Sequence, residues 1–269
     1  MDRLAPKKSL GQNFLTDRNM AAKIVRALDI SPDEPTIEIG PGEGALTGLL
    51  IESGARLTAV DIDIRAIALL KEKFKDAQFE IISGDFREID LGALSARYGQ
   101  KLAVIGNIPY NISSDIFFKL FESAGHIRAA VLTVQKEVAR RVNSGPGSKE
   151  YGILSVARAM AASSRIQFDI PPGCFFPRPK VTSSVIRLEF FEESEYADKY
   201  NGIMRLVRAA FNQRRKMLGN SLKSYISQKS GMSKAELTDK HGTEIEQYFS
   251  RRPEQMAVED FARLYEMLG

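Results

Sequence analysis

The stretch TIEIGPGEGALT, residues 36–47, decides the fold. Its first residues have the composition of a short β-strand, its glycines permit a tight turn, and a helix is expected from about residue 45 to 52. A strand that runs through such a turn into a helix is typical of nucleotide-binding α/β sheets. The spacing fits neither the dinucleotide pattern nor a P-loop, because Ala45 occupies the last glycine position and no Lys-Ser/Thr pair follows.

Two further strands that follow this loop are each expected to end in an acidic residue. Residues 56–60 form a strand that runs into Asp61, which lies about 20 residues beyond the first glycine, where such folds place a carboxylate on ribose hydroxyls. Residues 79–83 form the next strand, followed by Asp85 and Phe86. Asp85 can accept a hydrogen bond from an adenine amine, and Phe86 can flank the ring. Each acid can also be read as a turn or N-cap residue.

The fourth strand, residues 102–105, carries the motif GNIPYN at residues 106–111. Ligands of open α/β sheets bind outside the carboxyl ends of the strands. The Asn107 side chain and the Pro109 carbonyl can each accept one hydrogen of an exocyclic amine, while Tyr110 can stack on the ring. The motif can also be an ordinary turn, since Asn and Pro mark turns in general. The sequence therefore predicts either a grip for a planar base or a simple strand end.

The rest of this half alternates between helices and strands, which predicts a mostly parallel sheet with helices on both faces. Asp17 is the expected N-cap of a helix at 19–28, and Gln12 and Asn13 before it are interpreted as a turn or as a lid over a ligand. A stiff proline-rich loop at 171–180 carries Phe175, and residues 181–190 are expected to pair antiparallel as the last strand. Further helices are expected at 115–123, 136–142 and 151–162, and further strands at 129–134 and 166–170.

The composition of the chain argues against a membrane protein, a disulfide-linked protein and a metal site built on Cys or His. The chain has 269 residues, 43% of them hydrophobic and 27% charged, which suits one large domain and one small one. No run approaches the roughly 20 apolar residues of a membrane span, and the first residues lack a signal core. The single Cys174 excludes a disulfide within the chain, and His126 and His241 give no metal spacing. We therefore expect a cytoplasmic protein without a metal.

An acidic break at 192–195 marks the expected domain boundary, which gives domains at 1–193 and 194–269. The second domain is expected to be helical, with apolar residues at helical spacing, and between Arg205 and Arg252 basic residues far outnumber acidic ones. Such a basic helical module is typical of phosphate-backbone binding, although a solvated charged face gives the same pattern. The candidate RNA-binding residues are Arg208, Arg214, Arg215, Lys216, Lys223, Arg251 and Arg252.

Together these segments resemble the ribosomal RNA adenine dimethyltransferases of the KsgA or RsmA type. The resemblance is carried by residues 11–15, 38–47, 106–110, 175–181 and 211–215, which span nearly the whole chain. It implies a Rossmann-like class I methyltransferase domain with a mostly parallel seven-stranded sheet, and a small all-helical C-terminal domain. It also implies S-adenosylmethionine as the methyl donor and dimethylation of two adjacent adenines in a hairpin loop near the 3′ end of small-subunit (16S) rRNA.

The resemblance also implies roles for individual residues. Gln12, Asn13 and Leu15 would touch the donor from an N-terminal lid, and Gly40 and Gly42 would pass under its methionine part. Asp61 would hold the ribose, Asp85 and Phe86 the adenine, and Asn107 would close the site near the methyl group. The sequence departs from the family in two places, because the ribose acid is usually Glu and the residue at Ile108 is usually Leu. Asp61 is one methylene shorter, which would loosen the ribose contacts.

The expected chemistry needs no base residue. An adenine amine whose two hydrogens are accepted by Asn107 and Pro109 can direct its lone pair at the sulfonium methyl, while Tyr110 and Phe175 stack on the base. The expected partner is small-subunit rRNA or an immature subunit, bound by a monomer. The alternatives are an Erm-type methyltransferase of large-subunit rRNA, a DNA adenine methyltransferase and an assembly factor that acts by binding.

Overall fold

The computed structural model describes residues 4–269, and the chain divides into two compact units. The first unit comprises the chain up to Ala139 together with Ala162–Glu192, and the second comprises Arg140–Ala161 and Glu193–Gly269. The last of the three breaks, after Glu192, lies one residue from the boundary expected at 193. The other two breaks, which enclose residues 140–161, were not expected, because these residues continue the alternation of strands and helices in the sequence.

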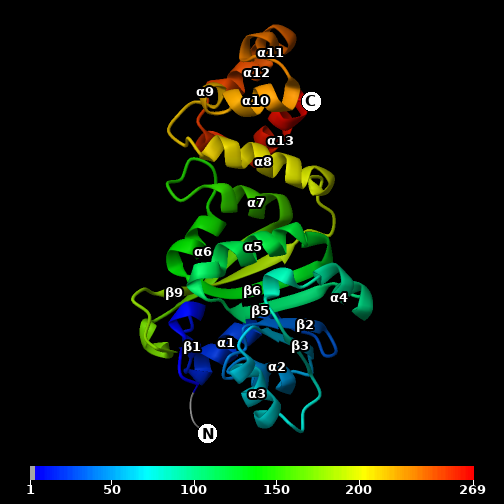
Figure 1. The fold of residues 1–269 in the computed structure, drawn as a ribbon, viewed down its shortest axis with the longest axis vertical. Helices are drawn as coiled ribbons and strands as arrows, with labels where there is room; N and C mark the ends of the chain where they lie inside the picture. Colours follow the sequence, from blue (N-terminus) through cyan, green and yellow to red (C-terminus); the bar gives the residue numbers. More distant parts are fainter. Residues whose placement is uncertain (1–3) are drawn as a thin grey trace. The chain divides into compact units, whose positions relative to one another are not determined.

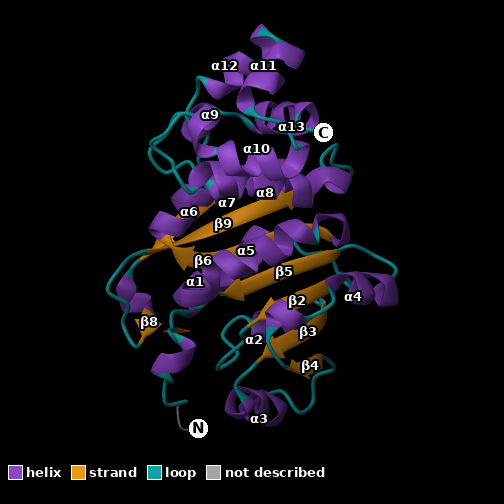
Figure 2. Ribbon diagram, turned by 45° about the horizontal axis from the view of Figure 1, so that its top comes forward, coloured by secondary structure: helices purple, strands orange, loops and turns teal. Residues whose placement is uncertain are grey.

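A seven-stranded sheet in the order β4-β3-β2-β5-β6-β9-β7 forms the centre of the first unit (Figure 2). All neighbouring pairs from β4 to β6 are parallel, and β9 pairs antiparallel with both β6 and β7, as expected for the last strand. The strands are β2 (Pro35–Ile39), β3 (Arg56–Asp61), β4 (Glu80–Ser83), β5 (Leu102–Asn107), β6 (Ile127–Gln135), β7 (Ala162–Ile170) and β9 (Ser183–Phe190), and a separate two-stranded sheet joins β1 (Phe14–Leu15) to β8 (Phe175–Phe176).

Both faces of the large sheet are buried. Ile24 and Leu50 from the helices join Ile105 and Val131 from the strands in one hydrophobic cluster. Val104 alternates with these strand residues, so it faces the opposite side, and it is equally inaccessible to solvent. Burial on both faces explains why the strands are continuously apolar. The helices of this unit are α1 (Arg18–Leu28), α2 (Thr47–Glu52), α3 (Ile64–Lys73), α4 (Leu91–Tyr98) and α5 (Ser113–Glu122), while α6 (Lys136–Asn143) begins in it and ends in the second unit.

The second unit is helical in the part that the structure describes. The helix α7 (Ile153–Ala161) lies beside α8 (Tyr200–Phe211) (Figure 1). The ring of Phe211 contacts those of Tyr151 and Phe261, and the Tyr151 hydroxyl donates to the Met256 carbonyl over 2.8 Å. Residues 140–161 therefore supply part of the core of this unit. Its other helices are α9 (Leu218–Ser221), α10 (Lys223–Ser230), α11 (Lys234–His241), α12 (Thr243–Phe249) and α13 (Val258–Met267).

Local signals explain why the site-bearing elements form where they do. Asp17 caps α1 by accepting hydrogen bonds from the backbone of Asn19 and Met20, as its position in the sequence predicts. Asp63, Asp85 and Asp90 cap the elements that follow β3 and β4 in the same way. Each cap fixes the point at which the chain leaves the strand edge, so the side chains at the strand ends converge.

Candidate methyl-donor and adenine site

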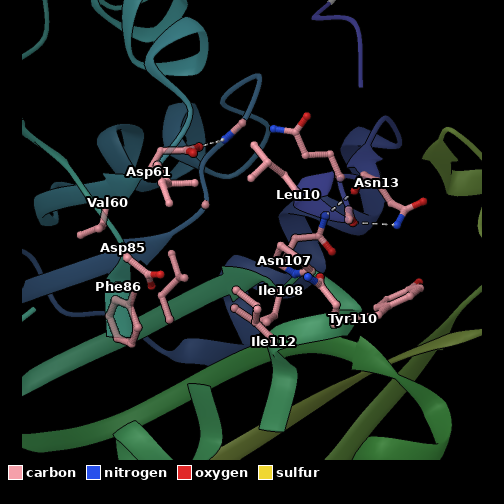
Figure 3. A pocket seen from close by; sticks show the side chains of 18 of the residues that line it. Leu10, Asn13, Val60, Asp61, Asp85, Phe86, Asn107, Ile108, Tyr110 and Ile112 are labelled. Carbon is pink, nitrogen blue, oxygen red and sulfur yellow. Dashed lines mark hydrogen bonds between the residues drawn. The ribbon is translucent and has the colours of Figure 1, made fainter. Parts of the chain in front are cut away.

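A cavity of about 200 Å³ lies at the carboxyl ends of β2, β3, β4 and β5 (Figure 3). The motif segments expected to meet there do so, and the N-terminal segment forms part of the wall. The predicted site residues that line it are Gln12, Asn13, Gly40, Gly42, Asp61, Asp85, Phe86, Asn107, Pro109 and Tyr110. The other lining residues, which were not predicted as site residues, are Ser9, Leu10, Gly11, Phe14, Ile39, Val60, Ile62, Gly84, Arg87, Ile108, Asn111 and Ile112.

The glycine loop leaves space for a ligand. Gly40 and Gly42 have φ values of 62° and 54°, a region that favours glycine. A Cβ atom added at Gly40 or at Gly84 would meet no protein atom within 4 Å, so the space beside both backbones belongs to the cavity. A Cβ at Gly42 would instead come within 2.9 Å of the Phe14 ring. The loop therefore accommodates a ligand on one side and packs against the N-terminal segment on the other.

Asp61 lies at the end of β3 and is 8% exposed. Its two carboxylate oxygens accept hydrogen bonds from the backbone amides of Gly42, over 3.2 Å, and Asp63, over 2.8 Å. Burial raises the pKa of Asp61, and these two amides oppose that shift. Each oxygen keeps acceptor capacity, so the carboxylate can receive the two hydroxyls of a ribose.

Asp85 follows β4 and is held by its neighbour Arg87. The guanidinium donates to both carboxylate oxygens, over distances of 2.6 and 3.0 Å, and it lowers the pKa of Asp85. The carboxylate is therefore ionised and is an acceptor only, as contact with an adenine amine requires. Phe86 is 4% exposed and presents its ring to the cavity near Asp85 (Figure 3). The open glycine loop and the acceptors at the two strand ends fit the methionine, ribose and adenine parts of a nucleoside donor.

Asn107 is oriented by a contact that the sequence did not indicate. Its side-chain nitrogen donates to the backbone carbonyl of Asn13 over 2.8 Å (Figure 3). Since a carbonyl can only accept, this contact requires the nitrogen of the amide on that side and leaves the side-chain oxygen as the acceptor. This is the orientation that a base amine requires.

The other two groups of the motif differ in how well they fit their predicted roles. The Tyr110 hydroxyl is 2.7 Å from the Ser183 hydroxyl, which anchors the far end of the side chain that lines the cavity. The Pro109 carbonyl already accepts from the Ile112 backbone amide and the Ser113 hydroxyl, both over 3.2 Å. An incoming amine would share this carbonyl or displace the rotatable Ser113 hydroxyl, so Pro109 is a weaker acceptor than the sequence suggested.

Three residues are placed differently from their predicted roles: Phe175 and Leu15 lie outside the cavity, and the Gln12 amide is engaged by another side chain. Phe175, expected to stack on the base, is 4% exposed and belongs to the hydrophobic cluster, because its side of β8 faces the core. Phe176 points the other way and is 44% exposed. Leu15 is buried opposite Phe175 in the two-stranded sheet, outside the main cavity. The Gln12 amide lies at the cavity, but its nitrogen donates to Asp63 over 3.0 Å.

Sequence reasoning also missed a buried acid, Glu38. It lies within β2, is 1% exposed and accepts a hydrogen bond from the Thr47 hydroxyl over 2.7 Å. Burial raises the pKa of Glu38 to about 8. A charged residue inside an otherwise apolar buried strand was the available signal. Among the described residues, no group of His, Cys, Asp and Glu could hold a metal ion.

The predicted RNA-binding residues all lie in the second unit but are not equally available. Arg214 pairs with Glu254 over 3.0 Å, and Arg251 pairs with Asp260 over 3.1 Å. Arg208 is exposed and also interacts with a neighbour. The remaining candidates, which are exposed, are Arg215, Lys216, Lys223 and Arg252.

The sheet order and the pocket at the carboxyl ends of its strands are those of a class I methyltransferase, the enzymes that use S-adenosylmethionine as the methyl donor. A family model described as "Ribosomal RNA adenine dimethylase" matches residues 3–254. The chain therefore belongs to the ribosomal RNA adenine dimethylase family, and it is a methyltransferase.

Relatives and solved structures agree with this family. "Ribosomal RNA small subunit methyltransferase A" of Salinibacter ruber is 46% identical over 83% of this chain and 75% of its own length. The protein of the same name from Parabacteroides distasonis is 38% identical over 96% and 92%. A dimethyladenosine transferase from Plasmodium falciparum has a TM-score of 0.77 at 24% identity, over 93% of this chain and 95% of that one, and so shares the fold. The 23S rRNA methyltransferase ErmE has a TM-score of 0.67 at 25% identity, over 95% and 99%.

Proposed function

We propose that this protein transfers two methyl groups to the exocyclic amine of each of two adjacent adenines in the loop of the 3′-terminal hairpin of small-subunit rRNA. The observation that carries the proposal is the fixed amide of Asn107, a residue that lines a pocket fitting a nucleoside donor and whose side-chain oxygen is left as an acceptor. The relatives named as small-subunit enzymes, at 38–46% identity, favour this RNA over the large-subunit substrate of ErmE.

The residues of the site act by binding and alignment. S-adenosylmethionine, when bound, supplies an electrophilic methyl group. An adenine amine is a poor nucleophile because its lone pair is delocalised into the ring. By accepting one amine hydrogen, the Asn107 oxygen favours a pyramidal nitrogen whose lone pair is free to react, and the Pro109 carbonyl can accept the other. The nitrogen loses one proton to water after each transfer, so no base residue is required. Alignment of this kind supplies up to about 7–11 kcal/mol in favourable cases.

The adenine must leave its stack to reach this site, which costs a few kcal/mol. Stacking on Tyr110, whose hydroxyl is anchored by Ser183, offsets about 1–3 kcal/mol of that cost. The exposed Phe176 is the better candidate for a second aromatic contact, since Phe175 is buried. Exposed cations of the second unit, such as Arg215 and Lys216, would hold the RNA backbone.

The test is mass spectrometry of small-subunit and large-subunit rRNA after incubation with the protein and S-adenosylmethionine. The proposal expects N6,N6-dimethyladenosine at two adjacent positions of the small-subunit hairpin. Methylation of large-subunit rRNA alone would make the protein an Erm-type enzyme, and absence of methylation from both would leave a binding role in assembly.

We further propose that the protein acts as a cytoplasmic monomer and contributes to small-subunit assembly. None of the described helices is long and apolar enough to cross a membrane. Sedimentation of the purified protein tests the monomer. Ribosome profiles of cells carrying Asn107→Ala test whether the assembly role is separate from methylation, because that variant removes only the amide side chain.

A further inference from the structure

The carboxylate of Asp63 is a buried charge that the chemistry above does not use. Its side chain is fully inaccessible to solvent, and it lies directly after β3 at the N-cap of α3. A buried carboxylate is stable only when it is paired and hydrogen-bonded. Arg65 provides the largest part of this compensation, since its guanidinium donates to both oxygens over 3.0 and 2.6 Å.

The remaining partners of Asp63 come from the N-terminal segment, defined here as residues 4–13. The Gln12 side-chain nitrogen donates to Asp63 over 3.0 Å, and the Lys7 ammonium lies 3.4 Å from the other oxygen. The Gln12 side-chain oxygen accepts from the Lys7 backbone amide over 2.8 Å, and Arg65 also donates to the Ala5 carbonyl over 3.1 Å. One carboxylate thus fixes the N-terminal segment at two of its side chains and, through Arg65, at its backbone.

The N-terminal segment connects the residue that orients Asn107 with the region of the candidate ribose acid, Asp61. Residues 9–13 line the cavity, and the residue after Gln12 is Asn13, whose carbonyl orients the Asn107 amide. At the other end, the backbone amide of Asp63 donates to Asp61, the candidate ribose acid. A continuous series of contacts therefore runs from the donor acid through Asp63 and Gln12 to the amide that accepts the base amine.

We propose that Asp63 is a positioning residue that fastens the N-terminal segment over the donor pocket, so that donor affinity and the orientation of Asn107 depend on one buried carboxylate. This inference rests on the proposed function for the identity of the donor. Residue types alone gave no such role, because Gln12 was expected to contact the donor directly. In the structure Gln12 instead joins the segment to α3.

Two variants test the side chain without removing the helix cap. Asp63→Asn and Asp63→Ser both keep an N-cap residue of the preferred kind. Asn loses the charge and one acceptor, and Ser is too short to reach Gln12 and Lys7. The matched control is Glu72→Gln, an exposed carboxylate on the same helix. Loss of hydrogen bonds to a charged group predicts a roughly 10-fold weaker S-adenosylmethionine Kd for Asp63→Ser.

Hydrogen exchange of residues 4–13 provides a readout that does not depend on activity. Asp63→Ser should accelerate exchange in this segment in the free protein, and Glu72→Gln should not. A double-mutant cycle with Gln12→Ala then asks whether the two side chains act together. The proposal expects Gln12→Ala to weaken donor binding in the wild type and to add little in the Asp63→Ser background.

Unchanged exchange and an unchanged donor Kd in Asp63→Ser would overturn the proposal. So would full additivity with Gln12→Ala, since Asp63 would then act through Asp61 alone. Failure of the proposed function would look different: the wild type would not bind S-adenosylmethionine or would not methylate rRNA, whereas the exchange difference between Asp63→Ser and Glu72→Gln would still report on the fastening of the segment.

Discussion

The donor pocket of the first unit and the basic surface of the second unit hold their charged groups in opposite ways. Asp61 and Asp85 in the pocket and Asp63 beside it each accept at least two hydrogen bonds from neighbouring groups. On the basic surface, Arg215 and Lys216 extend into solvent. The difference fits the two proposed tasks. Methyl transfer requires alignment of the reacting atoms, whereas binding to an RNA backbone depends on charge and tolerates mobile side chains.

The largest expected effect is on the rate of methyl transfer, and it comes from Asn107 in the pocket. Asn107→Ala removes the acceptor for the base amine and should lower the single-turnover rate of methyl transfer about 100- to 1,000-fold, as does the loss of one preorganised hydrogen-bonding group in other enzymes. RNA affinity should stay within twofold. The control is Asn220→Ala, an exposed amide in the second unit. Wild-type rates in Asn107→Ala would show that the amide is not required.

The second prediction concerns pH. The pKa of Glu38 in the folded protein, about 8, lies above the ordinary value of 4.5, so the folded state binds more protons than the unfolded state between these values. Stability contributed by this group therefore falls as pH rises through that window, by at most about 1.4 kcal/mol per pH unit. Glu38→Gln should remove the loss. Urea unfolding at pH 5 and pH 8 measures it, and a difference between variant and wild type that does not change with pH would contradict the prediction.

The third prediction concerns the basic surface. Arg215→Ala combined with Lys216→Ala should reduce the slope of log K against log salt by roughly 1.4–1.8 if each side chain neutralises one phosphate. Donor affinity should not change. RNA binding measured from 50 to 200 mM salt provides the slope. An unchanged slope would show that Arg215 and Lys216 do not belong to the RNA-binding surface.

The smallest effect distinguishes Arg214 from its neighbour Arg215. Arg214 pairs with Glu254 and donates to the Lys149 carbonyl over 2.8 Å, so it holds residues 147–149 against the helices of its own unit. Arg214→Ala should lower the free energy of unfolding by about 1 kcal/mol, a value usual for a partly exposed pair, and leave the salt slope unchanged. Arg215→Ala should leave the free energy of unfolding unchanged and lower the salt slope. A lower slope in Arg214→Ala would show that Arg214 contacts RNA directly.

The sequence was informative about which residues meet at the edge of the sheet. The shared position of Asp61, Asp85 and Asn107 could be predicted because strand boundaries are visible in apolar runs and the ends of parallel strands meet at one edge. The last strand was correctly expected to be antiparallel. These inferences need only local patterns and one general rule of sheet topology.

The failures concern contacts between distant segments. Nothing local shows which of Phe175 and Phe176 faces the core, because that depends on the register with β1. The pairing of Gln12 with Asp63 joins residues 51 positions apart. The helix α7 was assigned to the first domain because it follows the alternation of strands and helices, but Tyr151, which precedes it, packs against Phe211 far along the chain. Tertiary packing determines the orientation of the two Phe side chains, the partner of Gln12 and the unit to which α7 belongs.

We propose that methyl transfer and RNA binding depend on separate groups of residues, and that Asn107 is the group that aligns the base amine. The most direct measurement is a single-turnover assay on small-subunit rRNA that reports the transfer rate and the RNA Kd for Asn107→Ala and for the double variant at Arg215 and Lys216. We expect a rate loss without a change in Kd for the first variant, and a Kd increase with a normal rate at saturating RNA for the second. A normal rate in Asn107→Ala at saturating RNA would contradict this proposal.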